Sequence, residues 1–142
     1  MKPLLEPRHD LTPMEIDALE DRLYEHNRAA TGRDDAARIG FVICDETGRM
    51  IGATAGYTWA GVSEIQQMWV DEAFRGQGYG RALLEAMIAE ANRRGVSRIW
   101  VGSYDFQAPG LYERAGFVRM AELGGWPQGH VKMILCKTLH QG

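Results

Sequence analysis

Three glycines at alternate positions, Gly76, Gly78 and Gly80, separate an apolar run from a long amphipathic pattern in MWVDEAFRGQGYGRALLEAMIAEANRRG. A strand that runs through a glycine-rich turn into a helix presents unpaired backbone N–H groups beside the positive end of the helix dipole. Glycine has no Cβ, so phosphate oxygens can approach those groups closely. The spacing therefore predicts a phosphate or pyrophosphate site. The alternative is a glycine-rich helix start that binds no ligand.

Several other chemistries are disfavoured by the same sequence. The loop GQGYGR lacks the G-K-[ST] ending of a P-loop, and it is G-x-G-x-G where the dinucleotide fingerprint is G-x-G-x-x-G. No serine has a G-x-S-x-G setting, which argues against a nucleophilic hydrolase. The histidines are too scattered for a zinc-binding spacing, and we expect no metal: His9, His26, His130 and His140.

The elements that would position the loop form one alternation of helices and strands. Thr12 before Pro13 predicts the start of a first helix, and Gly32 predicts its end. A second helix is predicted from the apolar stripe of residues 79–94, and a short third helix from Pro109. Strands are predicted at residues 37–45, 50–60, 63–71, 96–104, 118–123 and 129–139. The pattern indicates an α+β sheet with one parallel crossover through the second helix.

Composition limits the partners and the compartment. The chain has 142 residues, enough for one domain, with 45% hydrophobic residues and a formal net charge of -3. That charge argues against nucleic acid or an anionic membrane as a partner and suits a cationic substrate better. Cys44 and Cys136 lie in apolar runs, which predicts buried free thiols in a reducing cytoplasm. No apolar run approaches the ~20 residues of a membrane span, and the charged N-terminus does not resemble a signal peptide.

Two motifs resemble those of the GCN5-related N-acetyltransferases, the GNAT superfamily. Residues 75–80 match the acetyl-CoA loop pattern [QR]-x-x-G-x-[GA], and FQAPGLYERAGF is similar to the segment A-x-x-L-Y-x-x-x-G-F. The similarity covers residues 41–139 and points to a small single-domain bacterial type occupying residues 1–142. The resemblance implies the GNAT fold, a mixed and mostly antiparallel sheet of six to seven strands with a V-shaped splay, flanked by about four helices.

Acetyl-CoA is the cosubstrate that the resemblance implies. The backbone of Met68, Trp69 and Val70 would hydrogen-bond the pantetheine arm as a further β-strand does, with a β-bulge near the slot. Backbone N–H groups of the loop and helix start would hold the pyrophosphate. The loop residues implied in cofactor binding are Arg75, Gly76, Gln77, Gly78, Tyr79, Gly80 and Arg81.

Two side chains would act on the reaction. Tyr112 occupies the position of the tyrosine that many GNAT enzymes place near the CoA sulfur, where it would protonate the departing thiolate or only position it. Glu64 lies eleven residues before Arg75, as the catalytic glutamate of GNAT histone acetyltransferases does. Its strand parity with Met68 predicts one face with the cofactor contacts. An exposed carboxylate beside a catalytic water chain is the alternative for Glu64.

The acceptor site is the least specified part. Asn27, Asp105 and His130 are candidates to line it, and Asp105 and His130 are also the runners-up for the base. Asp105 departs from the asparagine that many relatives have after this strand. The resemblance implies direct transfer of acetyl in a ternary complex to a primary amine of a small molecule or peptide, with a homodimer as a further expectation. The cytoplasm is the expected compartment, because the sequence shows neither a membrane span nor a signal peptide. The alternative is a non-catalytic acyl-CoA-binding sensory or regulatory module.

Overall fold

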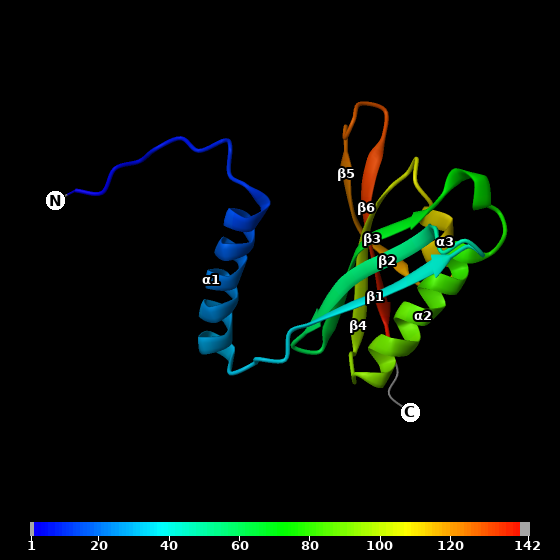
Figure 1. Cartoon of the computed structure of the whole chain (residues 1–142), viewed down its shortest axis with the longest axis horizontal. Helices are drawn as coiled ribbons and strands as arrows, with labels where there is room; N and C mark the ends of the chain where they lie inside the picture. The colour runs from blue at the N-terminus through cyan, green and yellow to red at the C-terminus, as the bar shows by residue number, and fades with distance from the viewer. Residues whose placement is uncertain (1, 140–142) are drawn as a thin grey trace. The chain divides into compact units, whose positions relative to one another are not determined.

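The computed structural model describes residues 2–139, which fall into two compact units divided between Asp34 and Asp35 (Figure 1). The first unit contains α1 (Pro13–Thr31), whose predicted start is confirmed. Thr12 closes a capping box with Glu15, because its hydroxyl accepts from the Glu15 N–H at 3.2 Å while its own N–H donates to the Glu15 carboxylate. Gly32 ends the helix in the left-handed conformation, as expected. That residues 1–142 form a single functional domain stays a prediction.

The second unit is one six-stranded sheet with two α-helices. Its strand order is β1-β2-β3-β4-β6-β5, and every neighbouring pair is antiparallel except β3 and β4. The strands are β1 (Ala37–Cys44), β2 (Met50–Trp59), β3 (Val62–Val70), β4 (Arg98–Tyr104), β5 (Val118–Gly124) and β6 (Val131–Thr138). The helical segments are the 3₁₀ turn η1 (Glu72–Phe74), α2 (Tyr79–Arg93) and α3 (Pro109–Arg114). The described residues therefore contain three α-helices and one 3₁₀ turn, where about four helices were expected.

The predicted splay lies between the two parallel strands. β3 and β4 pair only from Val62 opposite Arg98 to Ile65 opposite Val101, although both strands continue further. The separation coincides with a β-bulge in β3, where Gly56 of β2 pairs with Ile65 and the residue before it, Ala55, pairs with Gln67. Gln66 is the extra residue, and such an insertion bends its strand. The bulge expected near the slot is confirmed.

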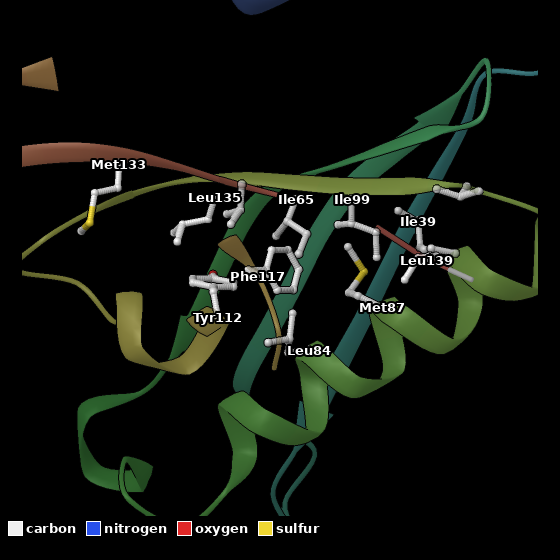
Figure 2. Packing of buried hydrophobic residues seen from close by; sticks show 13 residues of the cluster. Ile39, Ile65, Leu84, Met87, Ile99, Tyr112, Phe117, Met133, Leu135 and Leu139 are labelled. Carbon is white, nitrogen blue, oxygen red and sulfur yellow. The ribbon is translucent and has the colours of Figure 1, made fainter. Parts of the chain in front are cut away.

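The hydrophobic core fixes α2 against one face of the sheet. Figure 2 shows Leu84 and Met87 of α2 pointing toward Ile65 and Ile99 of the sheet, with Tyr112 close by. The stripe predicted from the sequence is the buried side of α2, which consists of Leu83, Leu84, Met87 and Ala91. Because most helical stability comes from packing an amphipathic face, this core sets where the N-terminus of α2 lies relative to β3.

The cysteine prediction is half wrong. Both thiols are free, but Cys44 is exposed and Cys136 is half-buried. Cys44 is the last residue of the edge strand β1, where no neighbouring strand covers it on one side. An apolar run in the sequence does not distinguish a central strand from an edge strand.

In the part of the chain that the structure describes, no helix combines the length and the apolar character needed to cross a membrane.

Candidate active site

A cleft of about 750 Å³ opens where β3 and β4 separate. One wall is the end of β3 with the glycine loop and the first turn of α2, and the other is the end of β4 with α3. Most of the predicted cofactor residues line this cleft, together with residues of the second motif. It is lined by residues 65–70, 74–76, 78–81, 101–103, 106–108, 111, 112 and 114. Gln77, also expected in the cofactor site, is not among them.

The glycine loop has the geometry of an anion site. Gly76 and Gly78 have φ of +75° and +86°, and open space lies where a Cβ would be in each. Gly78 is the N-cap of α2, and no side chain caps the helix. The N–H of Ala82 donates to the Gly78 carbonyl at 3.0 Å, so the N–H groups of the preceding turn have no intrahelical acceptor. A bare, uncapped helix start with room before it fits a pyrophosphate.

The arginines of the loop have partners within the protein. The Nε of Arg75 donates to the carbonyl of Val70 at 3.1 Å, which ties the loop to the end of β3. Arg81 forms an exposed ion pair with Glu85, with Nε and a carboxylate oxygen 2.9 Å apart. Arg75 and Arg81 both line the cleft, and so does Arg114 of α3 in the opposite wall. Three positive residues around one cleft suit an anionic ligand.

Tyr112 lies on α3 with its ring in the core, where only 4% of the residue is exposed. The ring packs edge to face on Phe117 with centroids 5.6 Å apart. The hydroxyl has no hydrogen-bond partner among the described residues, but its oxygen is not fully buried. Because Tyr112 lines the cleft, we infer that the hydroxyl opens onto it. Burial raises the pKa of Tyr112 to about 12. The hydroxyl therefore stays protonated and available as a donor at any physiological pH.

This burial predicts a loss of stability in alkali. An exposed tyrosine has a pKa of about 10, so above about pH 10 the unfolded chain loses a proton that the folded protein keeps until its pKa of about 12. The free energy of unfolding of the wild type should then fall by about 1 kcal/mol more than that of Tyr112→Phe between about pH 9 and about pH 11. Urea unfolding followed by tryptophan fluorescence measures this difference. An equal fall in both proteins would contradict the burial of the phenol.

Glu64 does not lie on the face that its sequence parity predicted. Because Gln66 is an extra residue in β3, Ile65 and Gln67 point to opposite faces, and Met68 returns to the side of Ile65 that α2 covers. Glu64 lies on the other face of the sheet and pairs with Tyr57 of β2. Burial and then a hydrogen bond to the Glu64 carboxylate raise the pKa of Tyr57. Glu64 does not line the cleft wall, but it precedes the bulge by only two residues.

Asp105 and His130 are brought together from different parts of the chain. The Nδ1 of His130 lies 2.9 Å from a carboxylate oxygen of Asp105, and the other oxygen accepts from the N–H of Val131 at 3.3 Å. The rings of His130 and Phe106 pack edge to face, with centroids 5.2 Å apart, and Phe106 lines the cleft. The Asp105–His130 pair therefore contacts the cleft through the ring of Phe106. Asn27 is on α1 in the other unit, and its acceptor role stays a prediction.

Some lining residues were not among the sequence candidates. Ala108 and Leu111 belong to the second motif, so its pattern could have indicated them. Gly102 and Ser103 belong to no motif, and they reach the cleft only because β4 separates from β3. Phe106 stands at the start of the second quoted segment, outside the positions that its pattern specifies. No group of three or more His, Cys, Asp or Glu side chains that could hold a metal ion occurs within residues 2–139.

Comparisons of the sequence and of the structure with known proteins all point to one class of protein, the acetyltransferases. A model described as the acetyltransferase (GNAT) family matches residues 5–117. Acetyltransferase Atu2258 of Agrobacterium fabrum is 31% identical over 79% of this chain and 82% of its own. Blasticidin-S acetyltransferase of Streptomyces morookaense is 33% identical over 68% of this chain and 71% of its own. The crystal structure of an acetyltransferase from Bacillus cereus superposes with a TM-score of 0.79 at 25% identity, covering 94% of this chain and 98% of that chain.

The matched family and the relatives assign the protein to the acetyl-CoA-dependent N-acetyltransferases, and the cleft between the separated strands, with a bare helix N-terminus beside it, agrees with that class. The chain belongs to the GNAT acetyltransferase family, as the resemblance of its two motifs indicated.

Proposed function

We propose that the protein transfers an acetyl group from acetyl-CoA directly to a primary amine of a small molecule or peptide, in a ternary complex. The observation that supports this most is the continuity of one cleft from the uncapped start of α2 to the gap between β3 and β4. Pyrophosphate would bind at the first end, held by the N–H groups that follow Gly78. The pantetheine arm would run along Met68, Trp69 and Val70, where β3 has separated from β4.

The reaction requires three events at the gap. The amine must lose a proton, negative charge on the thioester oxygen must be stabilised, and the C–S bond must break as the C–N bond forms. Tyr112 faces the cleft as a neutral donor. A full proton transfer from a phenol with a pKa of about 12 to a thiolate with a pKa of about 8.5 is uphill. This difference favours a hydrogen bond to the developing thiolate, the positioning role, over complete protonation by Tyr112.

Glu64 is the proposed base, and its place on the face away from α2 agrees with an acceptor that approaches from that side. Its hydrogen bond with Tyr57 orients the carboxylate. A water molecule would carry the proton from the amine to Glu64, because Glu64 does not line the cleft itself.

Glu64→Gln should lower kcat by about 10²-fold and leave the dissociation constant of acetyl-CoA nearly unchanged, since the amide keeps the shape but cannot take a proton. Steady-state thiol release and calorimetric titration measure the two quantities. Tyr57→Phe is the matched control, because it removes the partner of Glu64 and retains the carboxylate. An unchanged kcat in Glu64→Gln would remove this residue from the role of base.

The acceptor is proposed only by class. The formal net charge of -3 and the carboxylates of Glu64 and Asp105 favour a cationic amine over an acidic one. The Streptomyces relative is named for blasticidin S, which supports a small-molecule acceptor for this chain too. A cytoplasmic location and a homodimer remain part of the proposal.

The experiment that tests the proposed function is thiol release from acetyl-CoA over a panel of primary amines, with both substrates varied for any amine that reacts. Direct transfer predicts intersecting double-reciprocal plots, whereas parallel plots would indicate a covalent acetyl-enzyme. The second candidate, a non-catalytic acyl-CoA-binding module, predicts that acetyl-CoA binds in calorimetry while no amine accelerates thiol release.

A further inference from the structure

Lys132 of β6 lies over the wall of the cleft. Its backbone pairs with Tyr104 at the end of β4, and its side chain turns back along β4 to Gly102. A Cβ added to Gly102 would lie 2.8 Å from the Cε and 3.6 Å from the Nζ of Lys132. Gly102 lines the cleft and is the first residue of β4 after its pairing with β3 ends. Only a residue without a side chain therefore separates the Lys132 amine from the gap.

The amine is held there by aromatic rings and by no anion. Its Nζ lies 5.0 Å from the ring centroid of Tyr104 and 4.9 Å from that of Trp126. Tyr104 in turn stacks on Phe106, with centroids 5.0 Å apart, and Phe106 lines the cleft. Within the described residues, no carboxylate or hydrogen-bond acceptor contacts the Lys132 amine. The ring contacts are weak compared with a salt bridge in a closed site, so the amine can leave them for the gap.

The second compact unit, called the sheet unit below, contains one other lysine, which has a different environment. The Nζ of Lys137 donates to the carbonyl of Ala115 at 2.8 Å, which commits that amine to a structural hydrogen bond. The chain contains only three lysines, and the third, Lys2, lies in the N-terminal unit. Lys132 is thus the one lysine of the sheet unit, within the residues described, that combines a free amine with a place beside the cleft.

From this placement we infer that Lys132 is an internal acceptor: the protein acetylates this residue on Nζ with the acetyl-CoA bound in its own cleft. The inference rests on the proposed function. The ammonium loses one proton to solvent, and the neutral amine attacks the thioester carbon. The C–N bond forms, the C–S bond breaks, and the second nitrogen proton goes to the thiolate. The products are N-acetyl-lysine, the free thiol of CoA and one proton.

The modification would change the acceptor side of the site. Acetylation removes the positive charge of Lys132 and with it the cation–π contacts to Tyr104 and Trp126. Trp126 belongs to the β5–β6 connection that also carries His130. The unmodified and acetylated proteins should therefore differ in their affinity for external amines while they bind acetyl-CoA alike.

The test is peptide mass spectrometry of the whole purified protein after incubation with acetyl-CoA alone. We expect the mass of one acetyl group at Lys132, formed at a rate that does not depend on protein concentration and at least about tenfold faster than at Lys2, because the reaction is intramolecular. Lys132→Arg retains the cation over the rings, and the acetylation of the whole protein should then fall to the slow rate seen at Lys2. Equal slow labelling of Lys2, Lys132 and Lys137 would overturn the inference.

The failure of this inference and that of the proposed function have different signatures. Calorimetry with acetyl-CoA and thiol release with the amine panel are run on the same protein. Binding and turnover with an unmodified Lys132 would refute self-acetylation alone. Loss of acetyl-CoA binding, or binding without either turnover or labelling, would refute both.

Discussion

Gly78→Asp is expected to abolish acetyl-CoA binding and leave the protein folded. The new carboxylate would stand at the N-cap of α2, in the open space before the helix where the pyrophosphate is proposed to bind. Two like charges about 4 Å apart repel by about 4 kcal/mol at an effective dielectric constant of about 20, which corresponds to roughly 10³-fold in the dissociation constant. Calorimetric titration with acetyl-CoA measures this loss.

Gly78→Asn is the matched control because it has the same shape without the charge. Gly78 has a φ of +86°, and Asn and Asp are the residues other than glycine that tolerate the left-handed region best. Both are also favoured at helix N-caps, so the two variants should unfold at similar temperatures. We expect Gly78→Asn to retain most of the affinity. Equal affinities for the two variants would contradict a pyrophosphate at this helix start.

Tyr112→Phe is expected to lower kcat by about 10²-fold or more and to change the dissociation constant of acetyl-CoA by less than about threefold. The ring packs on Phe117 in the core, and phenylalanine preserves that contact, so the fold should be unaffected. Only the hydroxyl that opens onto the cleft is removed. Its donation to sulfur matters as the C–S bond breaks and contributes little to cofactor binding.

The control for this variant is Tyr79→Phe, which removes a hydroxyl from another tyrosine that lines the cleft. Tyr79 lies in the first turn of α2, at the proposed phosphate end. We expect its loss to affect kcat much less than the loss of the Tyr112 hydroxyl. Similar kcat values for Tyr112→Phe and the wild type would rule out any action of Tyr112 on the leaving group.

Local signals in the sequence predicted the part of the site that is contiguous in the chain. The apolar stripe of α2 defined the helix, and the glycines before it defined the bare N-terminus, because both features depend on near neighbours. The second motif placed Tyr112 on a short helix for the same reason. All six strands were also predicted, since β-branched and aromatic runs between turn residues are a local signal.

The face on which Glu64 lies could not be predicted, because it depends on a bulge. One inserted residue, Gln66, reverses the parity of everything that follows it in β3, and no residue type in this strand marks the insertion. The bulge is defined only by the register with β2. A prediction that assumes strict alternation along β3 therefore places Glu64 on the same face of the sheet as Met68, whereas Glu64 lies on the opposite face.

The contacts of Asp105, His130 and Lys132 depend on strand order. β6 lies between β4 and β5, which brings the first residues of β6 next to Tyr104 and Gly102. The sequence predicted a closing strand pair, but it contained no sign that the second strand of that pair would insert beside β4. The Asp105–His130 hydrogen bond and the rings around Lys132 follow from that insertion.

The most direct test of acetyl transfer at this cleft is to quantify, in one reaction, the thiol released from acetyl-CoA and the N-acetylated amine formed. The wild type should yield equal molar amounts of the two products, and Gly78→Asp should yield neither above background. Thiol release without an acetylated amine, or equal product from the wild type and Gly78→Asp, would contradict acetyl transfer from a cofactor bound at the N-terminus of α2.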